Sequence, residues 1–219
     1  MVPFRPPTAK YVPDLTIFPR DKVTYVGQAV AAVAATDPYI ARDAADLIHV
    51  EYEPLPAVAD PVKALEKDAP VIWPEAGSNV AFTLKSGSDD VEEALKKADE
   101  RITVRVVNNR LAAMPIEGRA IMVQPDGYND GLLVTIATQQ PHNDRSGIAM
   151  ILGIPENKVR LVTKDVGGAF GAKGTVYPEE AACAFLAYTL QKPVNWADTR
   201  SENLRTMTQG RAFVQEITI

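Results

Sequence analysis

The sequence predicts an α+β protein built from two successive units. Stretches with a hydrophobic residue at every second position, such as 101–108, indicate strands. A stretch with hydrophobic residues at the spacing i, i+3, i+4, i+7 indicates a helix that begins near residue 91. Prolines and a glycine between residues 60 and 79 separate two groups of such elements. We therefore expect one unit at 1–66, a linker at 67–77 and a second unit at 78–219.

The first unit is expected to contain two strands, a helix and a third strand. Residues 1–20 hold five prolines, so this segment should be extended rather than helical. The range 22–35 is predicted to form a strand, a turn and a second strand. Asp37 followed by Pro38 combines a capping side chain with a proline at the first helical position, which predicts a helix over 39–47. A strand is expected at 48–52.

The second unit is expected to alternate between strands and helices. Asp89 and Glu92 fit a capping box at the start of its first helix. Gly153 ends a later helix, because glycine readily adopts the left-handed conformation that follows a helix. The predicted strands are 101–108, 121–124, 132–137, 158–163, 193–196 and 211–219, and the later helices are 143–152 and 178–190. The strand at 211–219 has no evident partner in the sequence, so we expect an unpaired edge that favours association.

Composition and charge exclude several classes of function. Of the 219 residues, 46% are hydrophobic and 23% are charged, which is typical of a globular protein. A net charge of −5 argues against nucleic-acid binding, which needs an excess of Lys and Arg. No apolar run is long enough to span a membrane, and a cytoplasmic location is expected.

Metal-binding residues are scarce in this sequence. The single cysteine, Cys183, can form neither an internal disulfide nor an iron–sulfur cluster held by this chain alone. The two histidines, His49 and His142, show no spacing typical of metal ligands. We therefore expect no metal bound directly by protein side chains.

Four glycines between residues 167 and 174 form the strongest local motif, which follows the predicted strand at 158–163. Such glycines let consecutive N–H groups approach an anionic group such as a phosphate, an oxo group or a pterin oxygen. A tight turn without a ligand fits this loop equally well. A phosphate-binding P-loop does not fit, because Lys173 does not directly follow a glycine. The dinucleotide-binding pattern of three spaced glycines is also missing.

Two further segments carry polar residues at predicted loop positions. Gln139 lies where a strand is expected to end and a helix to begin, so its amide could donate to a bound oxygen or cap the helix. Glu117 and Arg119 could hold a buried corner through charged hydrogen bonds, or could form a surface ion pair of little energetic value.

In combination, these segments resemble the molybdenum-binding subunit of the xanthine dehydrogenase and aldehyde oxidase family, and most of all its carbon monoxide dehydrogenase large-subunit branch. Three N-terminal segments, at 23–31, 41–45 and 50–56, resemble that family's hammerhead domain. Five later segments continue the resemblance: 114–119, 138–142, 166–173 with 177–179, 193–196 and 200–202. In the first of these, Ile-Glu-Gly-Arg stands where the family has Met-Glu-Pro-Arg.

The resemblance implies roles for individual residues. Gln139 corresponds to a glutamine that hydrogen-bonds an oxygen on molybdenum. The loop of Gly167, Gly168, Ala169, Phe170 and Gly171 would lie beside the metal and its pterin. Ala169 stands where the family has glycine and would be strained if that position needs a positive φ. Gly174 replaces the glutamate of purine-type members, which argues against a purine substrate.

The resemblance also implies the architecture and the partners. The fold would be the C-terminal part of a hammerhead-like domain followed by the first part of a molybdopterin-binding domain. The chain would be partial: it would lack the base, and it would need the remaining segment of the molybdenum subunit together with iron–sulfur and flavin subunits or domains. The implied reaction is oxidative hydroxylation of carbon monoxide, an aldehyde or an N-heterocycle at a molybdenum–molybdopterin centre. Alone, the chain is expected to carry no molybdenum, to be inactive and to associate with itself or with a partner. The alternative is a non-catalytic fragment or interaction subunit, and neighbouring genes would discriminate between these possibilities.

Overall fold

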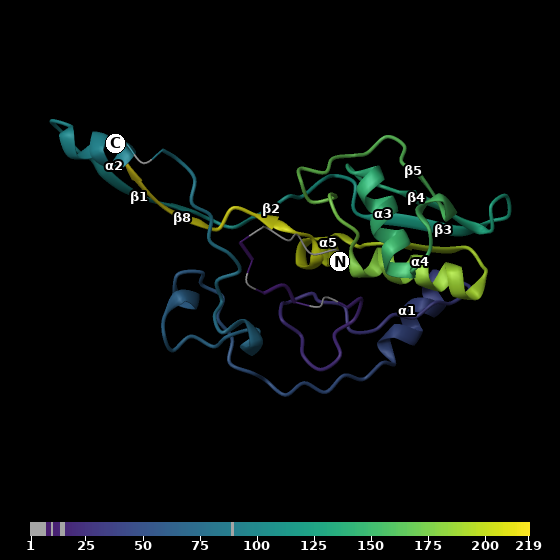
Figure 1. Ribbon diagram of the computed structural model, residues 1–219. Coiled ribbons are helices and arrows are strands. Elements are labelled where there is room, and N and C mark those ends of the chain that lie inside the picture. Colours follow the sequence, from purple (N-terminus) through teal and green to yellow (C-terminus); the bar gives the residue numbers. More distant parts are fainter. Residues whose placement is uncertain (1–7, 10, 14–15, 89) are drawn as a thin grey trace. The chain divides into compact units, whose positions relative to one another are not determined.

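The computed structural model describes residues 8–9, 11–13, 16–88 and 90–219. The chain divides into two compact units, whose described residues are considered separately below (Figure 1). From here on, the first unit means the compact unit that contains residues from Asp14–Glu53 and Ala112–Thr208, rather than the predicted range 1–66. The second contains residues from Phe4–Pro13, Pro54–Leu111 and Gln209–Ile219.

The first unit is built on a four-stranded sheet with the order β5-β4-β3-β6. Its strands are β3 (Ala120–Asp126), β4 (Gly131–Ile136), β5 (Val159–Val162) and β6 (Val194–Ala197). Strand β3 is antiparallel to both β4 and β6, whereas β4 and β5 are parallel. A parallel pair needs a crossover connection, and the helix α3 (Pro141–Leu152) lies within it. The carboxyl ends of β4 and β5 therefore lie at the same edge of the sheet.

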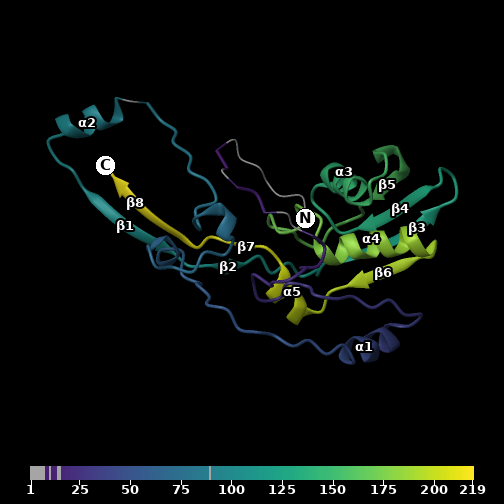
Figure 2. The same cartoon turned by 60° about the horizontal axis from the view of Figure 1, so that its bottom comes forward.

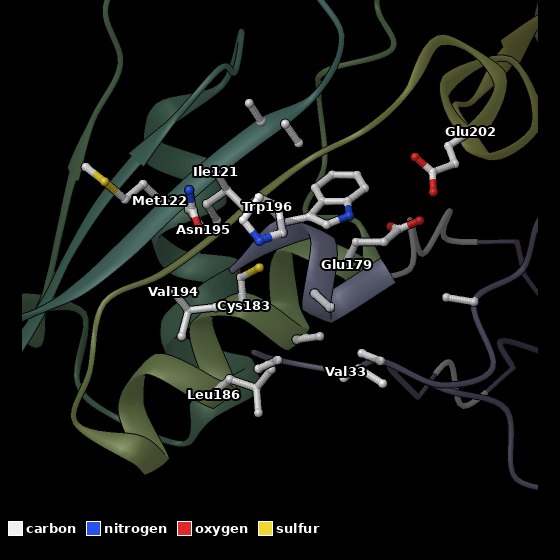
Figure 3. Close-up of a pocket in the computed structure, with 18 of the residues that line it drawn as sticks. Val33, Ile121, Met122, Glu179, Cys183, Leu186, Val194, Asn195, Trp196 and Glu202 are labelled. Carbon is white, nitrogen blue, oxygen red and sulfur yellow. The ribbon is translucent and has the colours of Figure 1, made fainter. Parts of the chain in front are cut away.

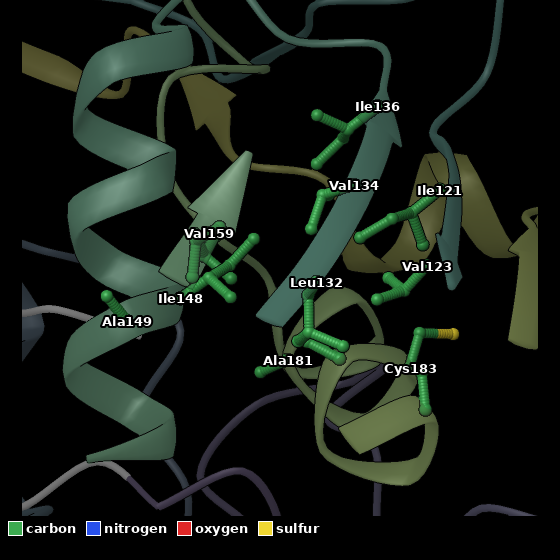
Figure 4. Packing of buried hydrophobic residues seen from close by; sticks show 13 residues of the cluster. Ile121, Val123, Leu132, Val134, Ile136, Ile148, Ala149, Val159, Ala181 and Cys183 are labelled. Atoms are coloured by element: carbon green, nitrogen blue, oxygen red, sulfur yellow. The ribbon is translucent and has the colours of Figure 1, made fainter. Parts of the chain in front are cut away.

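Two helices cover this sheet and form the core with it. Helix α4 (Pro178–Leu190) packs against β3 and β6, and α3 packs against β5 and against α4 (Figures 1 and 2). The strand register places Ile121 opposite Ile136 and Val123 opposite Val134, so these branched side chains share one buried face. Figure 4 shows Ile148 of α3 directed at the strands. Full burial of each such side chain contributes about 1.5–3 kcal/mol to folding.

The sequence prediction missed one helix, α5 (Arg200–Thr206). Thr199 caps it: the Glu202 N–H donates to Thr199 Oγ1 at 3.2 Å, and the Thr199 N–H donates to Glu202 Oε2 at 2.7 Å. This reciprocal pair is a capping box, and the Thr-x-x-Glu pattern that encodes it is visible in the sequence. The helix could therefore have been predicted from its first four residues.

The N-terminal part of the first unit differs from the prediction in its strands. Helix α1 (Pro38–Asp46) is confirmed, and the Asp37 carboxylate accepts the Tyr39 N–H at 2.7 Å as expected of a cap. The turn at Gly27 is also present, with a φ of 91°. However, the strands predicted at 22–35 and 48–52 are wrong, since both ranges are irregular. Branched residues favour extended backbone, but a strand needs a neighbour to hydrogen-bond, and these ranges pair with no other described segment.

The second unit contains an antiparallel ribbon of β1 (Thr103–Asn108) and β8 (Phe213–Thr218), in which Thr103 lies opposite Thr218. The expectation that the strand at 211–219 has no partner is therefore wrong. The partner lies far away in sequence, where local patterns cannot identify it. Helix α2 (Val91–Lys97) is present, whereas its predicted capping residue Asp89 lies outside the described residues.

Shorter elements complete the description. They are the 3-10 turns η1 (Lys63–Leu65), η2 (Pro74–Ala76) and η3 (Glu156–Lys158) and the short strands β2 (Leu111–Ala112) and β7 (Gln209–Gly210). The other predicted strands and helices are confirmed to within two residues. The boundaries 1–66, 67–77 and 78–219 remain a prediction. Among the described residues, no helix combines the length and apolarity needed to cross a bilayer.

Candidate functional site

Two loops that are distant in sequence meet at the carboxyl edge of β4 and β5. The Gly171 N–H donates to Gln139 Oε1 at 3.1 Å. The Gln139 N–H and the Thr138 hydroxyl both donate to the main-chain oxygen of Lys173, each at 3.0 Å. Because β4 precedes one loop and β5 the other, the parallel pairing of these strands brings the loops together. The structure thus places Gln139 against the glycine loop, as the resemblance implied.

The contact with Gly171 fixes the orientation of the Gln139 amide. An N–H group can donate only to the amide oxygen, so Oε1 faces the loop. The Nε2 group, with its two N–H donors, is therefore turned away from Gly171. Since Gln139 is exposed, those donors are available to a group bound outside the loop.

The backbone of the glycine loop turns through left-handed conformations. Gly168 has a φ of 99°, Gly171 has 87° and Phe170 has 53°. Ala169 does not have a positive φ, so the strain considered for alanine at this position does not arise. Phe170 is instead the residue with a side chain whose backbone is left-handed, and this residue is 75% exposed.

The loop also presents main-chain donors. The N–H groups of Gly167 and Gly171 are taken by Glu117 and Gln139. Those of Gly168, Ala169 and Phe170 make no hydrogen bond to other residues that the structure describes. Three consecutive N–H groups beside an outward glutamine amide form a donor set that suits the oxygens of an anionic group. The predicted loop residues therefore fit an oxygen-rich cofactor by the chemistry of their donors.

The corner at residues 114–119 contacts the glycine loop near both of its ends. Glu117 Oε2 accepts from Lys173 Nζ at 2.7 Å and from the Gly167 N–H at 2.9 Å. The Glu117 N–H in turn donates to the Gly167 oxygen at 3.1 Å. The hydrogen bond from Lys173 is the main reason why the pKa of Glu117 lies below its usual value. The sequence suggested Arg119 as the partner of Glu117, but the structure pairs Glu117 with Lys173.

Arg119 forms a separate buried corner. Its side chain is fully buried, with Nε 3.3 Å from Asp198 Oδ2 and Nη1 3.2 Å from Glu179 Oε2. Two aromatic rings contact the guanidinium, those of Tyr177 and Trp196, at 4.0 and 5.1 Å to the ring centres. Of the two alternatives raised by the sequence, Arg119 thus follows the buried one.

Two further carboxyl groups are buried in the first turns of the covering helices, Asp144 in α3 and Glu180 in α4. Burial raises the pKa of Glu180 to about 8, although the Tyr177 N–H donates to its Oε2 at 2.9 Å. Burial also raises the pKa of Asp144. An acid in the first turn of a helix is usually exposed, so the sequence gives no sign that Glu180 is buried.

A cavity of about 1290 Å³ lies elsewhere in the first unit. Figure 3 shows side chains from β3, β6 and α4 around it, among them Met122, Trp196 and Leu186. Neither Gln139 nor Phe170 lines this cavity, whereas Glu117, which contacts the loop at Gly167 and Lys173, does. Cys183 is buried here, and burial raises the pKa of its thiol to about 12, consistent with a packing role. No group of three or more potential metal ligands occurs among the described residues.

Comparison with protein families gives two matches that together cover most of the chain. Residues 72–219 match the family described as "Molybdopterin cofactor-binding domain". Residues 6–56 match the "Aldehyde oxidase and xanthine dehydrogenase, a/b hammerhead domain".

The proteins similar to this chain are much longer than it is. Subunit gamma of the 6-hydroxypseudooxynicotine dehydrogenase complex of Paenarthrobacter nicotinovorans is 40% identical over 197 residues, which is 90% of this chain and 24% of that protein. The carbon monoxide dehydrogenase large chain of Hydrogenophaga pseudoflava is 34% identical over 88% of this chain and 26% of that protein. The crystal structure of quinoline 2-oxidoreductase from Pseudomonas putida 86 matches with a TM-score of 0.84 and 32% identity, over 92% of this chain and 26% of that one. The chain thus spans about a quarter of the length of these relatives.

Proposed function

We propose, since this chain belongs to the molybdopterin cofactor-binding domain family, that it supplies two cofactor-contacting loops to a molybdenum hydroxylase. One loop contributes Gln139, and the other contributes Gly167, Gly168, Ala169, Phe170 and Gly171. The observation that carries the proposal is the hydrogen bond from Gly171 to Gln139, because it joins both loops into one set of donors.

The residues of the site would hold the cofactor through its oxygens. Gln139 Nε2 and the N–H groups of Gly168, Ala169 and Phe170 would donate to these oxygens. When bound, the molybdenum–pterin group supplies the redox centre at which a substrate carbon is oxidised and from which electrons leave to iron–sulfur and flavin partners. The protein's share is to orient this group and to stabilise negative charge on it.

The proposed substrates are carbon monoxide, an aldehyde or an N-heterocycle. Relatives named for 6-hydroxypseudooxynicotine, carbon monoxide and quinoline support carbon monoxide and an N-heterocycle within this range. Gly174 offers no carboxylate to a purine, and a Cβ at this position would lie 3.3 Å from Gln140 Nε2, so a larger side chain would press on its neighbour. We propose that the catalytic base and the rest of the cofactor site come from a further segment of the molybdenum subunit.

The test is purification of the chain together with the products of its neighbouring genes, followed by molybdenum and pterin analysis. We expect stoichiometric cofactor in this complex and none in the chain alone, because the donor set covers one side of a ligand that such sites usually enclose. In the complex, Gln139→Ala should lower turnover by about two to three orders of magnitude, which is the effect of losing one preorganised donor. Gln215→Ala, an exposed glutamine on β8, is the matched control. Normal turnover in the Gln139 variant would refute the assigned role.

A further inference from the structure

A single carboxylate oxygen closes the glycine loop at both ends. Glu117 Oε2 accepts from the N–H of Gly167, where the loop begins, and from the ammonium of Lys173, where it ends. A Cβ on Gly167 would lie only 2.6 Å from the Glu117 Cβ, so this approach requires glycine. Lys173 is 2% exposed and Glu117 is partly exposed. One side chain from a different segment, Glu117, therefore holds both ends of the loop, and this pair of hydrogen bonds is called the clamp below.

The clamp extends to Gln139 through the main chain of Lys173. The Lys173 oxygen accepts from both Thr138 and Gln139, and Gly171, two residues earlier, donates to the Gln139 side chain. Gln139 is thus held by the same short piece of loop whose end is fixed by the ammonium of Lys173. A displacement of Lys173 would move both the main-chain and the side-chain attachments of Gln139.

We propose that Glu117 is a positioning residue, which sets the direction of the Gln139 amide and of the N–H groups of Gly168, Ala169 and Phe170 by clamping Gly167 and Lys173. This inference rests on the proposed function, in which those donors face the cofactor. Glu117 need not touch the cofactor itself: its carboxylate acts through the loop. The hydrogen bond from Lys173 lowers the pKa of Glu117, which favours the ionised carboxylate that accepts both bonds.

A simpler role would be neutralisation of a buried ammonium. Removing Glu117 alone cannot separate the two roles, because an unpaired charge inside a protein is strongly destabilising. The double variant Glu117→Ala with Lys173→Met does separate them. It removes the charge together with its partner, keeps the Lys173 main-chain oxygen in place as that of methionine, and eliminates the clamp.

The experiment uses the full chain and two measurements. Thermal unfolding reports overall stability, and nuclear magnetic resonance reports amide exchange at Gly171 together with the side-chain amide signals of Gln139. In the double variant we expect the melting temperature to stay close to that of the wild type. The Gly171 amide should exchange roughly tenfold faster, which corresponds to the loss of about one net hydrogen bond. The Gln139 side-chain signals should move toward those of a free glutamine.

The control variant is Glu156→Ala, which removes a carboxylate from an exposed pair with Arg145. This variant should leave both the amide exchange at Gly171 and the side-chain signals of Gln139 unchanged. Unchanged Gly171 exchange and Gln139 signals in the double variant would overturn the proposal and leave charge neutralisation as the role of Glu117. A variant that fails to fold would also overturn it, because the ion pair would then support the whole domain rather than position the loop.

These measurements need no cofactor, so they are independent of the proposed function. If the complex lacked molybdenum but the double variant showed faster exchange at Gly171, the positioning role would stand and the proposed ligand would be wrong. If the complex held molybdenum while exchange was unchanged, the proposed function would stand and the clamp would be wrong.

Discussion

Arg119 and Asp198 are joined by hydrogen bonds in both directions. The Arg119 N–H donates to Asp198 Oδ1 at 2.9 Å, Arg119 Nε donates to Oδ2 at 3.3 Å, and the Asp198 N–H donates to the Arg119 oxygen at 3.0 Å. Arg119 directly precedes β3 and Asp198 directly follows β6, so the pair fastens these neighbouring strands at one end. Both side chains are almost completely buried.

Asp198→Ala is expected to destabilise the protein, because it leaves a buried guanidinium with one carboxylate instead of two. Loss of one partner from a buried ion pair lowers the free energy of unfolding by on the order of 3 kcal/mol. The measurement is urea denaturation followed by circular dichroism. Glu156→Ala, which breaks the exposed pair with Arg145, should change the free energy of unfolding by less than about 1 kcal/mol. Equal effects of the two variants would contradict the importance of burial here.

Gly118→Ala should also be destabilising, for a steric reason. A Cβ on Gly118 would lie 2.2 Å from Asp198 Oδ1, so either the carboxylate or the chain must shift. Such overpacking lowers the free energy of unfolding by about 1–3 kcal/mol. Gly127→Ala provides a control, since its Cβ would meet nothing within 4 Å and its φ is not positive. We expect the melting temperature to fall only for the Gly118 variant.

The buried carboxyl of Glu180 should make stability depend on pH. Its pKa is raised from 4.5 to about 8 in the folded protein, so the folded state retains a proton that the unfolded state releases. This group's contribution to stability is therefore fully present below pH 4.5 and is lost as the pH rises to about 8. Glu180→Gln keeps an acceptor for the Tyr177 N–H but does not titrate. Denaturation curves across this range should show a shallower decline for the variant, whereas parallel curves would argue against a protonated Glu180.

The ribbon of β1 and β8 should promote association. Each strand has one unpaired edge within the described part of the second unit, and the facing side chains of Val104 and Ile217 are 49% and 48% exposed. Exposed edges with apolar side chains recruit further strands. Light scattering should detect dimers or larger species in the wild type, and the double change Val104→Lys and Ile217→Lys should shift the population toward monomer. A wild type that stays monomeric at all concentrations would contradict this expectation.

Sequence patterns predicted the parts of the fold that local chemistry determines. Pro141 and Gly153 limit α3, and the Asp37 cap with Pro38 begins α1. The meeting of Gln139 with the glycine loop was also predictable, because both loops follow strands that lie at one edge of a sheet. The pairing of Glu117 with Lys173 was not, since the two residues are separated by 56 positions and Arg119 was the nearer cation. The strands expected at 22–35 and 48–52 show the opposite error, in which residue preference suggested strands that have no neighbour.

The ribbon also has a consequence for the order of events during synthesis. Thr103 of β1 faces Thr218 of β8 across 115 residues, and the whole four-stranded sheet of β3 to β6 lies between these strands in sequence. Strands β3 to β6 can therefore assemble on the ribosome before β8 has been synthesised and can pair with β1. During that interval the apolar side chains of β1 are open to other nascent chains and to chaperones. Slow translation between β1 and β8 would lengthen this period, so the yield of this protein should respond to the elongation rate in that stretch more than to the rate before Thr103.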